Sequence, residues 1–150
     1  GKGTKDWNFY RYAETVLSAA EAIAPSSGVN AEAAGYLAQV KARANMEGKD
    51  VSTIASEIQR LGKQAFIEEC WKERLREFPL EMKIWDDCVR TGKFPQISAT
   101  NKGEGQFVDL IGATNGSGAK FKETDLYWPI PVNERQRNPN LTQNEGYSAK

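Results

Sequence analysis

The sequence has 150 residues, of which 39% are hydrophobic and 27% are charged, as is ordinary for one soluble domain. The 20 basic and 20 acidic side chains cancel, so we expect neither nucleic acid nor an anionic membrane surface as an electrostatic partner. The absence of histidine excludes a Ser-His-Asp triad, a Cys-His pair and every zinc site that contains histidine. No apolar run is long enough to cross a bilayer, and residues 1–3 lack the features of a signal peptide. We therefore expect a protein that is either cytosolic or lacks its targeting segment.

Two amphipathic helices are predicted first. Residues 7–24, "WNFYRYAETVLSAAEAIA", carry apolar side chains at helical spacing, with Asp6 as a possible N-cap. Residues 25–29 interrupt the pattern, and Asn30 is placed to cap a second helix, "AEAAGYLAQVKARA". The facing sides are rich in small residues, so the sequence predicts a close antiparallel hairpin over about residues 7–46. Its length is near that of a tetratricopeptide-type repeat, which needs stacked neighbours, so we expect a piece of something larger or a docked partner.

A long helix is predicted over about residues 53–91, where apolar positions recur in steps of three and four. Ser52 or Thr53 is a possible cap, and Gly92 is expected to end the helix. Pro79 lies inside this pattern and predicts a kink or a break. Both cysteines, Cys70 and Cys88, fall in the same stretch. We favour two small buried thiols over a disulfide, which would require the helix to fold back near Pro79.

Four glutamates recur every four residues in this helix: Glu69, Glu73, Glu77 and Glu81. Paired carboxylates can hydrolyse glycosides, but catalytic pairs face each other across a cleft, whereas these share one side of one helix. Their neighbours Lys72, Arg74, Arg76 and Lys83 favour a solvated or ion-paired face instead. We therefore assign no catalytic residue, and the sequence indicates no cofactor and no metal ligand.

A second group of candidates is aromatic and consists of Trp7, Phe9, Tyr10 and Tyr12. Such rings could stack on a sugar or a base, but aromatic residues at helical spacing are more often part of a core, which we favour. The glycines at 103 and 105 and at 116 and 118 lack the spacing of a phosphate-binding loop and are interpreted as flexible linkers.

Residues 94–124 predict a long irregular loop, because glycine and polar residues dominate and only "FVDLI" at 107–111 is apolar enough to pack. In the segment 125–150, Pro129 and Pro131 require "YWPIP" to run extended. Asn133 is a possible cap for a single turn, Glu134 to Arg137, that Pro139 stops. The predicted fold class is therefore all-α: a tetratricopeptide-like helical hairpin and a long kinked helix, with a long irregular loop and an extended proline-rich C-terminal segment.

Three stretches resemble the SusD/RagB family, surface lipoproteins of Bacteroidetes that capture nutrients, mostly glycans. "YWPIP" followed by "NPNLTQNEGY", up to residue 147, resembles the family's C-terminal ending. "YRYAETVLSAAEA" at 10–22 is similar to its last tetratricopeptide-like helix, and "ERLREFPLEMKIWDDCVRTGK" at 73–93 is similar to its Glu-Arg-x-x-Glu-Leu-x-Phe-Glu-Gly-x-Arg-Trp motif and the residues that follow. The matching residues of the last stretch are Glu73, Arg74, Glu77, Glu81, Trp85, Asp87, Arg90, Thr91 and Gly92.

This chain departs from the family motif at three positions. Met82 and Ile84 stand where the family usually has glycine and arginine, and Pro79 falls inside the helix. Loss of the arginine is expected to remove a buried ion pair near Glu81. Because family members are several times longer, the resemblance implies that residues 1–150 are the C-terminal part of a SusD-like helical domain and that the family's N-terminal part is absent.

The resemblance also implies a function. It implies a non-catalytic component of polysaccharide utilisation that holds an oligosaccharide or peptide at the extracellular face of the outer membrane. The expected partner is a SusC-like TonB-dependent transporter, and membrane association is expected only through an N-terminal lipid anchor that this chain lacks. The alternative is a helical-repeat scaffold that binds a protein and has no glycan ligand.

Ligand contacts in the family come largely from segments that precede this chain, so we name no ligand-binding residue from the resemblance. The loop from Gly103 to Gly118 is the one surface we single out for contact with ligand or transporter. The tail is expected to pack back along the helical scaffold, with Tyr127 and Trp128 filling grooves between helices.

Overall fold

The computed structural model describes residues 9–97 and 105–147, so Asp6 and Trp7 lie outside the described residues. The prediction of an all-α fold is confirmed, since helices dominate the described chain and its sheet has two strands. The chain divides into two compact units, residues 1–84 and residues 85–150.

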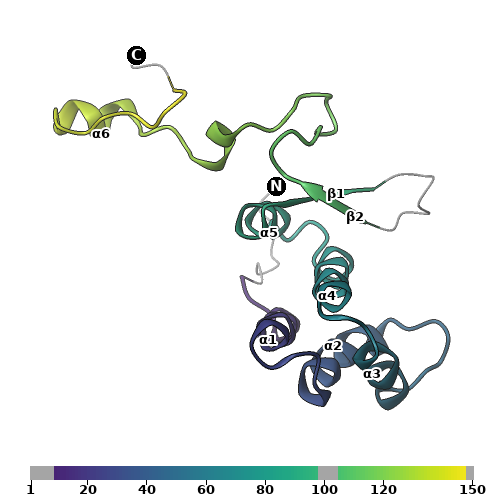
Figure 1. Cartoon of the computed structure of the whole chain (residues 1–150). Coiled ribbons are helices and arrows are strands. Elements are labelled where there is room, and N and C mark those ends of the chain that lie inside the picture. Colours follow the sequence, from purple (N-terminus) through teal and green to yellow (C-terminus); the bar gives the residue numbers. More distant parts are fainter. Residues whose placement is uncertain (1–8, 98–104, 148–150) are drawn as a thin grey trace, which may run out of the picture. The chain divides into compact units, whose positions relative to one another are not determined.

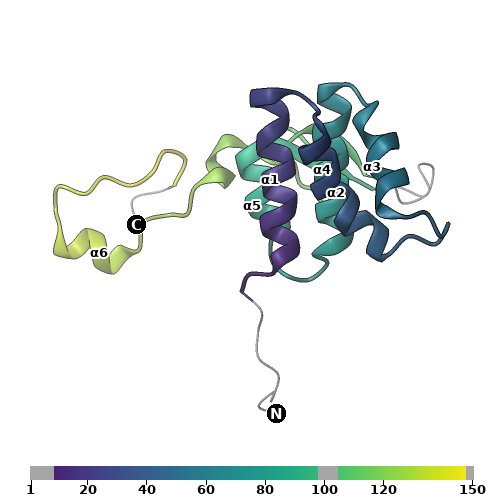
Figure 2. The ribbon, with the colours of Figure 1, turned by 90° about the horizontal axis from the view of Figure 1, so that it is seen from below.

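Four helices form the N-terminal unit: α1 (Tyr12–Ser27), α2 (Ala31–Arg43), α3 (Val51–Gln59) and α4 (Lys63–Glu77). They appear nearly end-on in Figure 1 and lengthwise in Figure 2, so their axes run alongside one another. Helix α2 packs against both α1 and α3, and α1 also packs against α4. This arrangement confirms the predicted hairpin of the first two helices.

Small residues allow α1 and α2 to approach closely, as the sequence predicted. Their shared core includes five alanines that are fully buried: Ala20, Ala24, Ala33, Ala34 and Ala38. Larger apolar side chains complete this core from all four helices, among them Leu17, Leu37, Ile54, Ile58, Phe66 and Phe78.

The first two helix boundaries agree in part with the sequence. The Asn30 side chain accepts a hydrogen bond from the Ala33 backbone N–H at 2.9 Å, which confirms it as the cap of α2. Helix α1, however, continues through Pro25 to Ser27 and ends at Gly28, where φ is +75°. Pro25 lacks the N–H that would bond the Glu21 carbonyl, so it weakens the last turn of α1 without ending it, and glycine adopts the left-handed angle at 28 without steric cost.

The predicted long helix over residues 53–91 is wrong, because the structure has three helices in its place. Helix α3 begins after Asp50, whose side chain caps it by accepting from the Thr53 N–H at 2.7 Å, so neither Ser52 nor Thr53 is the cap. The chain then breaks at residues 60–62, and the extended backbone of Gly62 starts α4. The sequence concealed this first break because the apolar spacing continues across it.

The second break is the one that Pro79 predicts. Helix α4 ends at Glu77, and the turn that follows contains two residues with positive φ, Leu80 at +64° and Met82 at +59°. Helix α5 (Ile84–Thr91) follows this turn and is succeeded by Gly92, where φ is +67°, as the sequence predicted.

The C-terminal unit contains elements that the prediction of an irregular loop missed. Strands β1 (Lys93–Gln96) and β2 (Gln106–Asp109) pair antiparallel, with Phe94 opposite Val108. A 3-10 helix, η2 (Glu123–Leu126), and helix α6 (Val132–Arg137) follow. Helix α6 begins after Pro131 rather than after Asn133, because a proline's fixed φ suits a helix start, and it ends at Asn138, directly before Pro139.

Candidate functional site

The row of four glutamates is held in ion pairs with the neighbouring helices. Lys41 on α2 binds Glu69 and lies 3.8 Å from Glu73, while Arg76 on α4 reaches both, at 3.2 and 3.1 Å. Burial by itself would raise the pKa of Glu69, but the hydrogen bond from Lys41 and the charge of Arg76 outweigh it and lower that pKa. Glu69 is therefore held as a carboxylate at neutral pH.

Arg11, just before α1, joins the end of α4 to the turn that follows it. Its guanidinium donates to the Glu77 carboxylate at 2.7 Å and to the Glu77 carbonyl at 2.8 Å. Two further bonds, at 3.0 and 2.8 Å, reach the two carboxylate oxygens of Glu81 in a bidentate arrangement. These bonds, that to Glu81 foremost, raise the pKa of Arg11 above its already high ordinary value and lower the pKa of Glu81.

The expected loss of an ion pair with the arginine missing at position 84 stays a prediction, but Glu81 itself is ion-paired in this structure. Arg11 supplies the charge from another part of the chain, and its guanidinium also lies over the Phe78 ring, 4.9 Å from the centroid. Glu77 binds a second arginine, Arg43. The predicted ion-paired face is thus confirmed, but three of its cations, Arg11, Lys41 and Arg43, come from outside α4.

Such a row is unsuited to acid–base chemistry. A general acid needs a carboxyl group with a raised pKa, whereas the shifts at Glu69 and Glu81 are both downward. Glu73 is buried and ion-paired, and Glu77 is held between two arginines. This geometry stabilises the packing of α1, α2 and α4.

The aromatic residues near the start of α1 are not part of the core, which corrects the sequence prediction. Phe9, Tyr10 and Tyr12 are each about 70% exposed, and the structure does not describe Trp7. The reason is that α1 begins only at Tyr12, so the preceding rings do not share its buried face. Lys83 lies over both the Phe9 and the Tyr10 rings.

Both cysteines are free and buried, as predicted. Burial raises the pKa of Cys70 to about 12 and that of Cys88 to about 11. Thiols with such pKa values are poor nucleophiles at neutral pH, so the structure indicates a packing role for both.

The tail is clamped against itself by side chains of its last residues. Gln143 bonds both backbone groups of Ile130, accepting from its N–H at 2.7 Å and donating to its carbonyl at 3.0 Å. Asn144 donates to the Trp128 carbonyl at 2.7 Å, and the Tyr147 hydroxyl donates to the carbonyls of Tyr127 and Thr124. Both backbone groups of Ile130 and the carbonyls of Tyr127 and Trp128 are therefore hydrogen-bonded within the tail.

Position 146 in this clamp requires glycine. Its φ is +83°, and an added Cβ would lie 2.1 Å from Cγ2 of Thr124. The turn that aims the Tyr147 hydroxyl at its two carbonyls therefore requires glycine at position 146.

Tyr127 and Trp128 are 63% and 84% exposed. Neither ring is buried within the C-terminal unit. The predicted packing of the tail along the helical scaffold stays a prediction.

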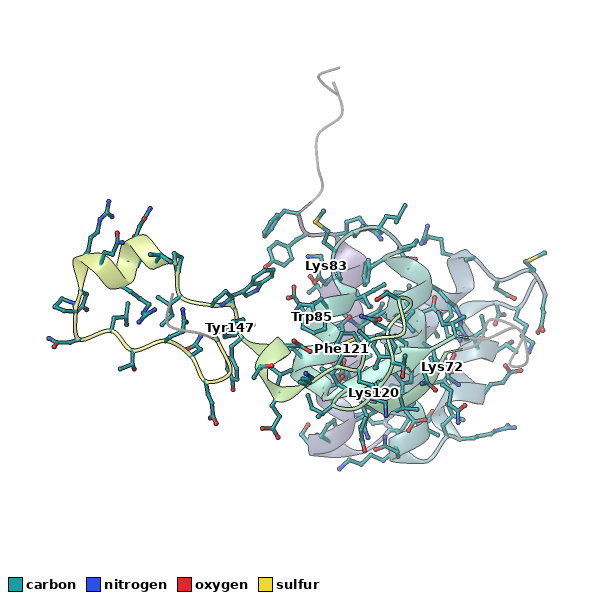
Figure 3. All side chains as sticks on the ribbon, turned by 90° about the horizontal axis from the view of Figure 1, so that it is seen from above. Lys72, Lys83, Trp85, Lys120, Phe121 and Tyr147 are labelled. Atoms are coloured by element: carbon teal, nitrogen blue, oxygen red, sulfur yellow. The ribbon has the colours of Figure 1, made fainter. Side chains whose placement is uncertain are left out.

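An open hollow of about 370 Å³ lies beside these rings. It is lined by Trp85, Asp125, Tyr127, Trp128 and Tyr147. Trp85, at the start of α5, is held by the Phe121 ring at a centroid distance of 5.6 Å, and both are labelled in Figure 3 together with Tyr147. Trp85 was not predicted from the sequence to line a site, because it lies more than 35 positions before Tyr127 and Trp128.

The loop from Gly103 to Gly118 lies only partly within the described residues, which resume at 105. Its described part contains β2 and a turn at Asn115, whose side-chain oxygen accepts from the backbone N–H groups of Ser117 and Ala119. The structure therefore shows an ordered turn where the sequence predicted a flexible linker at residues 116 to 118.

Comparison with known proteins connects these features to a family. A family model described as the SusD family matches residues 1–147. The chain belongs to the SusD family. It is 34% identical over 142 residues to the starch-binding protein SusD of Bacteroides thetaiotaomicron, covering 95% of this chain and 22% of that protein.

A solved SusD-family structure has the same fold. The chain superimposes on a SusD superfamily protein from Parabacteroides distasonis with a TM-score of 0.76 and 35% identity, covering 94% of this chain and 27% of that one. This chain therefore spans about a quarter or less of the length of these two relatives.

The three stretches that resemble the SusD/RagB family make specific contacts in this structure. Arg11 of the first stretch joins Glu77 and Glu81 of the second, and Gln143, Asn144 and Tyr147 of the third clamp the tail. None of the helices in the described ranges is long and apolar enough to span a membrane. No cluster of three or more metal-ligating side chains occurs among residues 9–97 and 105–147.

Proposed function

We propose that the protein to which this chain belongs binds glycan at the cell surface as a non-catalytic component of a nutrient-uptake system. The observation that carries the proposal is the family match over residues 1–147, together with 34% identity to a protein named for binding starch. Because the chain covers 22% of that relative, the proposal concerns the longer protein and not the isolated chain.

The absence of catalysis is proposed from the glutamate row. Glycoside hydrolysis needs two opposed carboxyl groups, one of them with a raised pKa. The row of Glu69 to Glu81 lies on one side of α4 and its following turn, is held by arginine and lysine, and has downward pKa shifts where shifts occur. The protein would then hold its glycan unchanged.

The proposed partner is a SusC-like TonB-dependent transporter, and the proposed location is the extracellular face of the outer membrane through an N-terminal lipid anchor. Both follow from family membership. The gene provides a direct check, since the proposal expects an upstream signal peptide ending in a lipid-modified cysteine and a neighbouring transporter gene.

Glycan binding can be tested by electrophoresis of the native protein in gels that contain soluble starch, xylan or levan. The expected result is retarded migration in at least one of these gels relative to a plain gel, with serum albumin as the unretarded control. Unchanged mobility in every gel would contradict the proposal. Deleting the loop from Gly103 to Gly118 tests the loop hypothesis in the same gels, because full retention of binding and transporter association would dispose of it.

The alternative is a helical-repeat scaffold that binds protein. One observation favours it, namely the large exposed apolar side chains at one end of the N-terminal unit, which are Phe9, Tyr10, Tyr12, Leu80 and Met82. This alternative predicts tight binding of a protein partner with no retardation by any polysaccharide, so the same gels distinguish the two functions.

A further inference from the structure

We infer that the hollow of Trp85, Asp125, Tyr127, Trp128 and Tyr147 is a contact site for a neutral oligosaccharide. The inference rests on the proposed glycan-binding function and adds to it a place in the C-terminal unit. It replaces the expectation that Tyr127 and Trp128 fill grooves between helices, because the same rings cannot do both. None of these residues was singled out as a ligand contact from the sequence.

The shape of the hollow suits a sugar ring. Its volume of about 370 Å³ is near the lower end of the range for small-molecule sites, roughly 300–1,000 Å³. Four aromatic rings line it, and among the described residues no two of these four stack on each other. Trp85 packs against Phe121, whereas Tyr127 and Trp128 are 63% and 84% exposed. The rings of these two residues are therefore available to the C–H groups of a pyranose, which pack on aromatic faces as other apolar groups do.

Two of the rings, and the backbone that carries the other two, are held before any ligand arrives. Trp85 is packed against Phe121, and the Tyr147 hydroxyl is bonded to two carbonyls, at 2.6 and 3.0 Å. The backbone beneath Tyr127 and Trp128 is held by Tyr147 and Asn144. A pre-ordered surface loses less conformational entropy on binding, which favours a ligand that offers only weak individual contacts.

The charges around the hollow favour a neutral ligand rich in hydroxyl groups. Its polar side chains include one carboxylate, Asp125, and no lysine or arginine lines it, so a phosphate or another anion would be repelled. Oδ2 of Asp125 accepts from the Lys122 backbone N–H at 2.8 Å, while Oδ1 takes no hydrogen bond from the described residues. That oxygen is placed to accept from a sugar hydroxyl.

The test measures the affinity of the protein, as the cell makes it, for maltoheptaose by isothermal titration calorimetry. Trp128→Ala is expected to weaken binding by about 2- to 12-fold, the range for loss of one aromatic contact, and Trp128→Phe to restore most of it. Tyr127→Ala and Tyr12→Ala form a matched pair, because both tyrosines are exposed and only Tyr127 lines the hollow. The first is expected to weaken binding and the second to leave it unchanged.

A local readout separates direct contact from an indirect effect. With 15N-labelled tryptophan, the indole resonances of Trp85 and Trp128 are expected to shift on addition of maltoheptaose. The Trp71 indole, which donates to Glu21 at 2.8 Å in the N-terminal unit, is expected not to shift.

Three results would overturn the inference. If maltoheptaose binds the wild type and all four variants equally, and neither the Trp85 nor the Trp128 indole shifts, the protein binds glycan at another site. If choline shifts the same two indoles and maltoheptaose does not, the hollow is a cation cage rather than a sugar site. If neither maltoheptaose nor the polysaccharides in the gels bind the wild type, both this inference and the proposed function fail.

Discussion

Replacing Met82 with glycine should relieve backbone strain in the turn between α4 and α5. Met82 has a φ of +59°, a left-handed conformation that costs a residue with a Cβ roughly 1–2 kcal/mol. Its side chain is 82% exposed, so less than a fifth of the burial energy of a methionine, or about 0.3–0.5 kcal/mol, is lost on its removal. Position 82 is also one at which the SusD/RagB motif usually has glycine.

A second methionine provides the control. Met46 is 101% exposed and is not among the residues with positive φ, so Met46→Gly introduces the same flexibility into the unfolded chain without relieving strain. We expect Met82→Gly to exceed Met46→Gly in free energy of unfolding by about 1 kcal/mol, the strain relieved less the packing lost.

Urea denaturation followed by far-UV circular dichroism measures this difference directly. In thermal melts it should appear as a gap of about 2–4 °C between the two variants. If both substitutions destabilise the protein equally, position 82 is not strained and the conformation of the turn is wrong.

Three further predictions concern the ion pairs, the thiols and the tail. Because the pKa of Glu69 is lowered in the folded protein, its ion pairs stabilise the fold above its ordinary pKa of 4.5, and this stabilisation is lost as the pH falls through the folded value. The urea midpoint should therefore drop below about pH 4.5. Glu69→Gln should make that drop shallower, and an unchanged pH profile would contradict this. Cys70 and Cys88 should resist iodoacetamide at pH 8 in the native protein and react in 6 M guanidinium. The reason is that both are buried and their pKa values are raised to about 12 and about 11. Rapid labelling of either thiol in the native protein would refute the packing role. Gly146→Ala should release the tail, since the new Cβ would lie 2.1 Å from Thr124 Cγ2. Trypsin should then cleave after Arg137 faster than in the wild type. Equal cleavage rates would show that the clamp does not hold the tail.

Local signals in the sequence predicted the N-terminal hairpin well. Asn30 is both a good cap by residue type and the observed cap, and the alanine-rich faces of α1 and α2 pack as their size suggests. Pro79 and Gly92 marked real boundaries because their backbone constraints act whatever the tertiary context. The break at residues 60–62 was missed because the apolar spacing runs on through a helix end.

The contacts between distant residues could not be read from spacing. Arg11 reaches Glu77 and Glu81 across 66 and 70 positions of sequence, and nothing in the periodicity of either segment indicates that pairing. The strand pairing of Phe94 with Val108 is similar, since each strand is short and lies in a stretch rich in glycine and polar residues. The hollow beside Trp128 was also missed, because it combines the start of α5 with both ends of the tail.

The central claim is that this chain belongs to a protein that binds glycan and leaves it intact. Calorimetric titration of the native protein with maltoheptaose, followed by chromatography of the recovered sugar, tests both halves at once. The expected result is a saturable heat of binding and unshortened maltoheptaose. Shorter oligosaccharides in the recovered sample, or no binding to this or any other glycan, would contradict it.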